Sequence, residues 1–189
     1  SCSTTDYDLV STASLQPRFE DKDPQDFGAR TPHRHEVHGI DVSKWNGDVD
    51  WQTVRKSGVS FVFIKATEGR SYVSPQLADQ TKKARDADCT VGFYHFLWPG
   101  NIEAQAEYFL SKTEERAGDL LALDWERTGE GTAATGKEKD AFLREIKRLR
   151  PDHRVLLYCN RDFWLNRDTT SYAGDGLWIA DYVTKGKPR

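Results

Sequence analysis

Leu120-Leu121-Ala122-Leu123-Asp124-Trp125-Glu126 is an apolar run that ends in two carboxylates two residues apart. Residues i and i+2 of a β-strand point to the same face, so Asp124 and Glu126 are expected to project together from a strand end. The alternate positions, two leucines and Trp125, make a bulky apolar face suited to packing under helices. Two neighbouring carboxylates push their proton affinities apart, and acid/base chemistry requires such a difference.

Short β-branched and aromatic runs recur on both sides of this stretch, and segments with helical periodicity separate them. We expect strands at residues 39–43, 60–66, 90–96, 120–125, 155–159 and 177–180. We expect helices at 50–57 and 75–86, and along the apolar stripes at 102–110 and 142–149. The alternation of strand and helix predicts an α/β fold with a parallel sheet.

Polar and aromatic residues gather at the carboxyl ends of the predicted strands, and no glycine-rich phosphate loop follows the first strand. In a β/α barrel these ends meet at one mouth, where barrel enzymes carry their chemistry, so the pattern favours a barrel over an open sheet. Residues two apart, or four apart in the last case, are expected to share a face: Asp41 with Ser43, Lys65 with Thr67, Tyr94 with Phe96, Asp124 with Glu126, Tyr158 with Asn160, and Trp178 with Tyr182.

Composition and charge limit the function classes. Residues 1–36 are polar without a sustained apolar period and are expected to form a tail or linker, and residues 37–189 form the folded domain. A net charge of −3 argues against a nucleic-acid partner, which would require a basic surface. No apolar run reaches transmembrane length. The histidine-rich segment at 33–38 lacks a second ligand set at metal-site spacing, so no metal site is predicted.

The three cysteines, Cys2, Cys89 and Cys159, are an odd number and do not form a disulfide framework. Cys89 precedes one predicted strand and Cys159 lies near the end of another, so they fall at opposite ends of a parallel sheet and no bridge is expected. The chain begins at Ser1 without a signal peptide, which leads us to expect a processed or trimmed product. Cys2 is either a spare thiol of the tail or the remnant of a lipid-modified N-terminus.

Three acids, Asp41, Asp124 and Glu126, are expected to share the predicted mouth with one cation, Lys65. Aromatic faces stack on the apolar faces of pyranose rings, while carboxylates protonate a leaving oxygen and stabilise an oxocarbenium-like centre. The residues therefore predict a sugar-cleaving cleft, in which Lys65 either binds substrate or only neutralises the buried carboxylates. The predicted aromatic surface consists of Tyr94, Phe96, Tyr158, Trp178 and Tyr182.

Several motifs follow one another in an informative order: His38-Gly-Ile-Asp-Val-Ser43 with Trp45, Phe63-Ile-Lys-Ala-Thr-Glu-Gly69, Gly92-Phe-Tyr-His-Phe96, Leu123-Asp-Trp-Glu126 and Trp178-Ile-Ala-Asp-Tyr182. Together they resemble glycoside hydrolase family 25, the lysozymes of the Chalaropsis and phage type. The resemblance covers roughly residues 38–189, and the second half is most similar to actinobacterial members.

This resemblance implies an irregular, TIM-like β/α barrel with fewer than eight helices. It implies cleavage, with retention, of the β-1,4 bond between N-acetylmuramic acid and N-acetylglucosamine in peptidoglycan. Carried over by motif, Glu126 is the general acid/base and Asp41 is the third acid. Asp124 either assists the 2-acetamido group of the substrate or acts as the nucleophile. The partner is then the peptidoglycan glycan strand, no cofactor is implied, and a secreted or cell-envelope location is expected.

The chain departs from the family at its end. Members usually continue past the position of Arg189 with a further strand, so the C-terminal closing strands are expected to be missing. This keeps a second function open, a non-catalytic cell-wall glycan-binding or structural domain that retains the cleft. A chitinase-like hydrolase is disfavoured, because such enzymes carry aspartates at the positions of Leu120 and Ala122. His95 alternates with its neighbours and is expected to face away from the mouth as a structural histidine.

Overall fold

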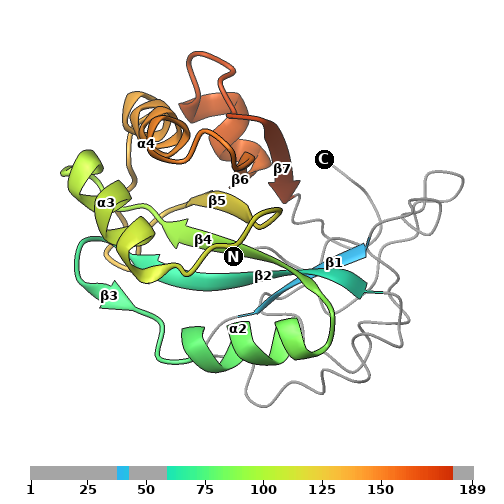
Figure 1. Ribbon diagram of the computed structural model, residues 1–189. Coiled ribbons are helices and arrows are strands. Elements are labelled where there is room, and N and C mark those ends of the chain that lie inside the picture. The colour runs from blue at the N-terminus through green and yellow to red at the C-terminus, as the bar shows by residue number, and fades with distance from the viewer. Residues whose placement is uncertain (1–37, 43–58, 181–189) are drawn as a thin grey trace, which may run out of the picture. The chain divides into compact units, whose positions relative to one another are not determined.

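The computed structural model describes residues 38–42 and 59–180, drawn in colour in Figure 1. The strands neighbour one another in the order β1-β2-β4-β5-β6-β7, and the short β3 pairs with β2. Parallel pairing joins β1 to β2 and runs from β4 through β5 and β6 to β7, which confirms the predicted α/β sheet. The bounds are β1 His38–Val42, β2 Val59–Glu68, β3 Tyr72–Val73, β4 Thr90–Phe96, β5 Leu120–Trp125, β6 Val155–Asn160 and β7 Gly176–Ala180.

The predicted closure into a barrel is not confirmed. Among the described strands the order runs from β1 to β7, and no pairing joins these two strands to each other. Three parts of the prediction lie outside the described residues: the tail at 1–36, the helix at 50–57 and the end of the chain at 181–189. The predicted domain boundary at residue 37 therefore stays a prediction.

The chain divides into two compact units, which are described separately. Of the described residues, 38–42, 59–64 and 75–91 belong to the first unit, and 65–74 and 92–180 belong to the second. In the described part of the first unit, β1 pairs with the beginning of β2, and helix α2 (Leu77–Asp86) follows Pro75. This helix buries Leu77, Gln80 and Ala84, which are three and four residues apart and share one face.

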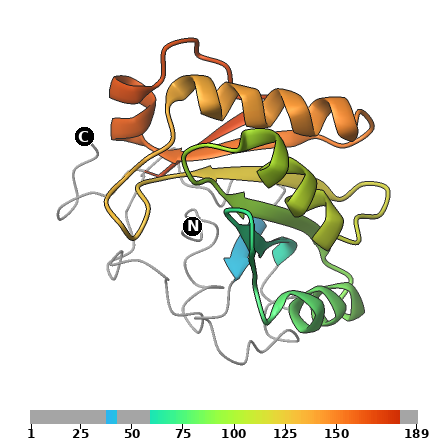
Figure 2. The same cartoon turned by 90° about the vertical axis from the view of Figure 1, so that its left-hand side faces the viewer.

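In the second unit, helices α3 (Ile102–Lys112) and α4 (Gly136–Leu149) pack against each other over one face of the sheet, as Figure 2 shows. The predicted apolar stripes supply the contact, since the rings of Phe109 and Phe142 are fully buried with their centroids 6.2 Å apart. Helix α4 begins six residues before its predicted stripe. Thr135 and Glu138 form a capping box there, in which each side chain bonds the backbone N–H of the other residue.

Alternate side chains of β4 and β5 point into this helical layer. His95 of β4 stacks on Phe142 at 4.9 Å, and Leu123 and Trp125 of β5 are completely buried. The indole Nε1 of Trp125 donates a hydrogen bond to the carbonyl of Ala134, 2.9 Å away. The predictions that His95 and the bulky side of β5 face away from the site are therefore confirmed. The intervening residues belong to the opposite face of the sheet.

Two short elements were not expected from the sequence. Strand β3 forms a hairpin with the end of β2 through a turn at Gly69, whose φ is +59°, a left-handed conformation that glycine adopts without strain. The π-helical turn η4 (Phe163–Arg167) follows β6. Cys89 and Cys159 are buried and unbridged, as predicted. None of the helices in the described part of the chain has the length and apolar composition of a membrane-spanning segment.

Candidate active site

A row of four side chains crosses the sheet on the face opposite α3 and α4. The strand register pairs Phe96 of β4 with Asp124 of β5, Asp124 with Tyr158 of β6, and Tyr158 with Trp178 of β7. Partners in neighbouring parallel strands point to the same face of a sheet. We call these four residues the site row. Four of the residues predicted from the sequence are thus direct neighbours, with the acid between aromatic side chains.

The aromatic members of the row differ in how much surface they expose. The rings of Tyr158 and Trp178 meet edge to face, with centroids 5.9 Å apart. Phe96 and Tyr158 expose 8% and 2% of their surface, and Tyr94, one step earlier on β4, exposes 2%. Trp178 is half-buried. Trp178 therefore has the most accessible ring of the row, and the predicted stacking role of all four aromatic residues stays a prediction.

Lys65 of β2 extends the row beyond Phe96. Its ammonium lies 5.2 Å from the ring centroid of Phe96 and 5.5 Å from that of Tyr72, an arrangement favoured by the negative face of an aromatic ring. It also donates to a carboxylate oxygen of Glu68 at 2.7 Å. The other oxygen of Glu68 accepts from Trp98 Nε1 at 2.9 Å. Burial alone would raise the pKa of Glu68, but Lys65 and Trp98 lower it below its ordinary value.

The predicted common face of Lys65 and Thr67 is wrong. The Thr67 hydroxyl lies 2.7 Å from Nδ1 of His95 and is buried on the helix side, whereas Lys65 lies over Phe96 on the site side. The side chains of Lys65 and Thr67 therefore contact opposite faces of β4, just before the turn at Gly69.

The two acids at the end of β5 flank an anchored tryptophan. Asp124 is 1% exposed, and Glu126, the first residue after the strand, is half-buried. Because the indole of Trp125 is fixed on the helix side, the alternation along β5 turns Asp124 to the other face and predicts the same for Glu126. The backbone N–H of Leu97 donates to the Asp124 carbonyl at 3.1 Å and secures the strand end.

Two of the predicted site residues are not placed by the described part of the chain. Asp41 lies in β1, where its backbone is paired with Phe63, and its side chain lies outside the described residues. Tyr182 lies wholly outside them. The catalytic role of Asp41 and the binding role of Tyr182 therefore stay predictions.

A buried lysine lies on the helix side of β5, beside Trp125, and was not predicted from the sequence. Lys139 of α4 is completely buried, and its ammonium contacts carboxylates of Asp140 at 2.5 Å and Asp168 at 2.6 Å and the carbonyl of Tyr172 at 2.6 Å. It lies 5.6 Å from the ring centroid of Trp125. A signal was present, because residue 139 is three and four residues before the apolar positions 142 and 143 and so shares their face.

The orientation and tautomer of the His95 ring are fixed by Gln105, a residue that was also missed. The amide nitrogen of Gln105 donates to the carbonyls of Trp98 and Gly100 at 2.7 and 2.6 Å, so its oxygen faces Nε2 of His95, 2.9 Å away. Nε2 must therefore carry the proton, and Nδ1 accepts from Thr67. Burial lowers the pKa of His95 to about 4. The ring is thus a structural group at neutral pH.

Other nucleophile and metal chemistry has little support in the described residues. Burial raises the pKa of the Cys159 thiol to about 12, so this thiol stays protonated and unreactive. In the ranges 38–42 and 59–180, no cluster of three His, Cys, Asp or Glu residues is arranged to hold a metal ion.

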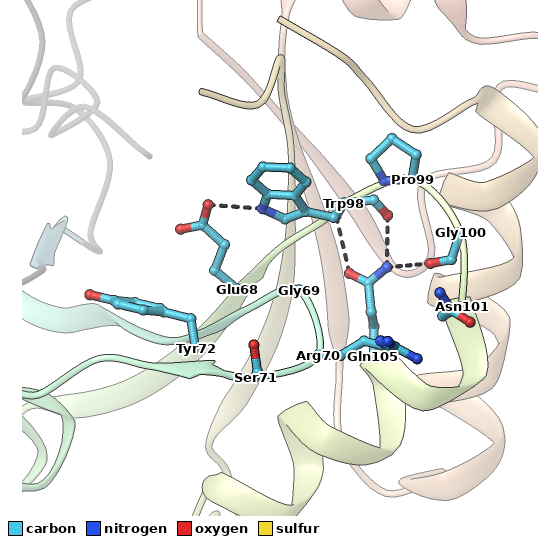
Figure 3. A pocket seen from close by; sticks show the side chains of 10 residues that line it. All are labelled: Glu68, Gly69, Arg70, Ser71, Tyr72, Trp98, Pro99, Gly100, Asn101 and Gln105. Carbon is cyan, nitrogen blue, oxygen red and sulfur yellow. Dashed lines mark hydrogen bonds between the residues drawn. The ribbon is translucent and has the colours of Figure 1, made fainter. Parts of the chain in front are cut away.

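A pocket of about 410 Å³ opens at the Lys65 end of the site row (Figure 3). Glu68, Tyr72 and Trp98 form one part of its lining, and Arg70, Ser71 and Asn101 form another. Figure 3 shows the Glu68 carboxylate and the Trp98 indole pointing toward each other, with Gln105 bridging the backbone of Trp98 and Gly100. One part of the pocket lining is therefore held in place by hydrogen bonds. The other part consists of polar side chains, from the β2–β3 turn and from Asn101 before α3.

Residues 40–189 match the sequence profile of Glycosyl hydrolases family 25. The chain belongs to this family. Lysozyme M1 of Streptomyces globisporus is 31% identical over 77% of this chain and 55% of that protein. The N,O-diacetylmuramidase of Chalaropsis sp. is 32% identical over 68% of each chain. The structure of a muramidase from Trichobolus zukalii superimposes with a TM-score of 0.70 and 25% identity, over 80% of this chain and 81% of that one.

The family 25 chain covers only part of several relatives. It spans 61% of the length of two Escherichia coli proteins to which it is 30% and 29% identical. Its membership in the family confirms the resemblance read from the motifs.

Proposed function

We propose that this chain is a peptidoglycan hydrolase that cleaves the β-1,4 bond between N-acetylmuramic acid and N-acetylglucosamine. The observation that carries the proposal is the site row, in which Asp124 lies between Phe96 and Tyr158 and is followed two residues later by Glu126. Family 25 membership supports the proposal, as does the similarity to a lysozyme and a diacetylmuramidase.

In the proposed reaction Glu126 donates a proton to the glycosidic oxygen while the bond from that oxygen to the anomeric carbon breaks. Asp124 either orients the 2-acetamido group, whose oxygen attacks the anomeric carbon, or attacks that carbon itself. Glu126 then removes a proton from the water that displaces this first nucleophile. Either route contains two displacements and retains the anomeric configuration. Asp41 is proposed as the third acid, which stabilises charge or orients its neighbours.

Lys65 is suited to hold a substrate oxygen beside these acids. Among the described residues its ammonium donates to Glu68, and an ammonium has three N–H donors. The remaining donors are available to a sugar hydroxyl or carbonyl. Trp178, half-buried at the other end of the site row, is the proposed stacking surface.

We further propose that the chain completes the irregular β/α barrel predicted from its motifs. The similarity to the Trichobolus zukalii muramidase, with a TM-score of 0.70, supports this architecture. Because the proposed substrate is the cell wall, a secreted or cell-envelope location is part of the same proposal. An experimental structure of the chain in which β1 and β7 stay far apart at open edges would contradict the barrel.

Analysis of the product ends tests the proposed reaction. The purified chain is incubated with peptidoglycan sacculi, and the released fragments are reduced and examined by mass spectrometry. We expect new reducing ends on N-acetylmuramic acid alone. Reducing ends on N-acetylglucosamine would identify a different glycosidase, while binding to sacculi without any new ends is the result expected of a non-catalytic wall-binding domain.

A further inference from the structure

The turn between β2 and β3 carries the cation of Arg70 beside the site row. Arg70 is exposed and borders the 410 Å³ pocket, and a second hollow of about 550 Å³ shares Arg70 and Ser71 with it. In the described part of the chain Arg70 makes no hydrogen bond or ion pair. The side chains of Ser71 and Asn101, which line the same pocket, also have no hydrogen bond to a described residue. Three polar side chains therefore remain available to a ligand.

The charge of this pocket favours an anion. Glu68 is the acidic side chain in the lining of the 410 Å³ pocket, while Glu107 lines the adjoining hollow, and both oxygens of Glu68 are engaged, one by Lys65 and the other by Trp98. The pair of Lys65 and Glu68 is neutral as a unit, so Arg70 supplies the net positive charge. A guanidinium binds a carboxylate through two parallel N–H groups, with a geometry that a single ammonium does not offer.

The pocket is held in shape before any ligand arrives. The backbone N–H and carbonyl of Trp98 are both bonded to the side chain of Gln105, and its indole is bonded to Glu68. The turn that carries Arg70 is tied to β4, because the N–H of Gly69 donates to the carbonyl of Phe96 at 3.2 Å. A wall fixed in this way loses little conformational entropy on binding.

The same contacts place the pocket next to the site row. Gly69 is bonded to Phe96, a member of the row, and Leu97, which precedes Trp98, is bonded to the carbonyl of Asp124. In the proposed substrate, every muramic acid carries a peptide stem through its lactyl group, and stem peptides bear free carboxylates. A glycan strand bound along the row with a muramic acid unit near Phe96 would bring such a carboxylate to the end of the row where Arg70 lies.

We propose that Arg70 and this pocket bind a carboxylate of the peptide stem, so that the chain prefers glycan that still carries its peptides. This inference rests on the proposed muramidase function for the identity of the ligand. Ser71 and Asn101 supply hydrogen bonds to the same carboxylate, and the Trp98 indole covers the apolar part of the stem residue.

The first test is a binding measurement that does not require cleavage. Calorimetric titration compares a soluble disaccharide-peptide with the same disaccharide lacking its peptide. We expect the peptide to strengthen binding to the native chain about tenfold, and Arg70→Gln to remove that gain. The matched control is Arg116→Gln, an exposed arginine in the loop before β5, at the other end of the strands, which should bind like the native chain. Equal affinities of the native chain and Arg70→Gln for the disaccharide-peptide would overturn the proposal.

The second test uses cleavage and separates the two proposals. Initial rates are measured on intact sacculi and on glycan strands stripped of stems by an amidase. Arg70→Gln should raise KM on intact sacculi without changing kcat, and should leave the rates on stripped strands unchanged. An equal loss of activity on both substrates would contradict a role in stem binding. If the native chain releases no reducing ends from either substrate, the proposed function fails, and the calorimetric comparison still decides whether Arg70 binds the stem.

Discussion

Two buried lysines, one on each face of the sheet, are satisfied in different ways. Lys139 lies in the helical layer, where its ammonium donates to the Asp168 carboxylate and the Tyr172 carbonyl at 2.6 Å and forms an ion pair with the Asp140 carboxylate at 2.5 Å. Lys65 lies on the face of the site row. Among the described residues its ammonium donates to Glu68, and it also contacts two aromatic rings, those of Tyr72 and Phe96. Both lysines are less than a tenth exposed.

The difference teaches how a buried charge can be assigned to structure or to function. An ammonium that is completely buried and neutralised by two carboxylates is not accessible to a ligand, so Lys139 holds α4 to the loop after η4 and supports Trp125. Lys65, in contrast, lost its water shell on burial beside the site row, and the described residues replace only part of the lost hydrogen bonding. We infer that the compensation for Lys65 comes from substrate.

The largest expected effect on stability is that of Lys139→Met. This change leaves the Asp168 carboxylate buried without its cation and leaves Asp140 with only the more distant Arg144, and breaking a buried pair in this way typically costs about 3–5 kcal/mol. Lys65→Met should cost only about 1–2 kcal/mol, because Glu68 is partly exposed and keeps its bond to Trp98. Urea unfolding followed by tryptophan fluorescence measures both. Equal losses for the two variants would break the comparison.

His95 belongs to the same helical layer as Lys139 and should make the stability of the chain sensitive to acid. Its pKa is about 4 in the folded chain and about 6.5 when exposed in the unfolded chain. Between these values the unfolded state binds more protons, so stability falls as pH decreases from about 6.5 to 4. The loss attributable to His95 is roughly 3 kcal/mol at pH 4.

Unfolding free energies of the native chain and of His95→Gln between pH 7 and pH 4 check this value. Carboxylates elsewhere titrate in both proteins, so the difference between the two pH dependences isolates the imidazole. Parallel curves would show that His95 is not held neutral by burial.

A smaller effect is expected for Lys65→Met, on catalysis. Loss of one charged hydrogen bond to substrate should lower kcat/KM on sacculi by about 10- to 100-fold at a temperature where the variant is fully folded. The double variant Lys65→Met with Glu68→Gln separates the two roles of the lysine. If Lys65 only neutralises Glu68, the double variant recovers the native rate; we expect that it does not.

No measurable effect on stability is expected for Lys82→Met. Lys82 pairs with Asp86 along α2 at 2.5 Å, a distance as short as those around Lys139, but both side chains are more than 60% exposed. Exposed pairs gain little because water screens them and their side chains lose conformational freedom. A midpoint of urea unfolding that differs clearly from that of the native chain would show that burial is not what distinguishes the two faces.

Much of the fold could be predicted because its strands are buried apolar runs with clear ends. Strands β4 and β5 begin and end at the predicted residues, and the register that aligns Phe96, Asp124, Tyr158 and Trp178 follows from parallel pairing of strands placed in this way. The family could be identified for a related reason, because its motifs lie at these strand ends.

The features that the sequence did not reveal depend on contacts between distant segments. Strand β3 has only two residues and exists because β2 continues past its predicted end to pair with it. The opposite directions of Lys65 and Thr67 depend on His95, which lies on another strand and accepts the threonine hydroxyl. The helical spacing of Lys139 places it on the apolar face of α4, but its partner Asp168, 29 positions later, is identified only by the folded structure.

The central claim is that the acidic pair at the end of β5 performs the hydrolysis, and Glu126→Gln tests it most directly. The matched control is Glu130→Gln, in the exposed turn four residues later. Release of reducing ends from sacculi is measured for both variants after their unfolding midpoints have been shown to equal that of the native chain. We predict a loss of about 10²- to 10⁴-fold for Glu126→Gln, since the proton donor is removed, and native activity for Glu130→Gln. Native activity in Glu126→Gln would contradict the account.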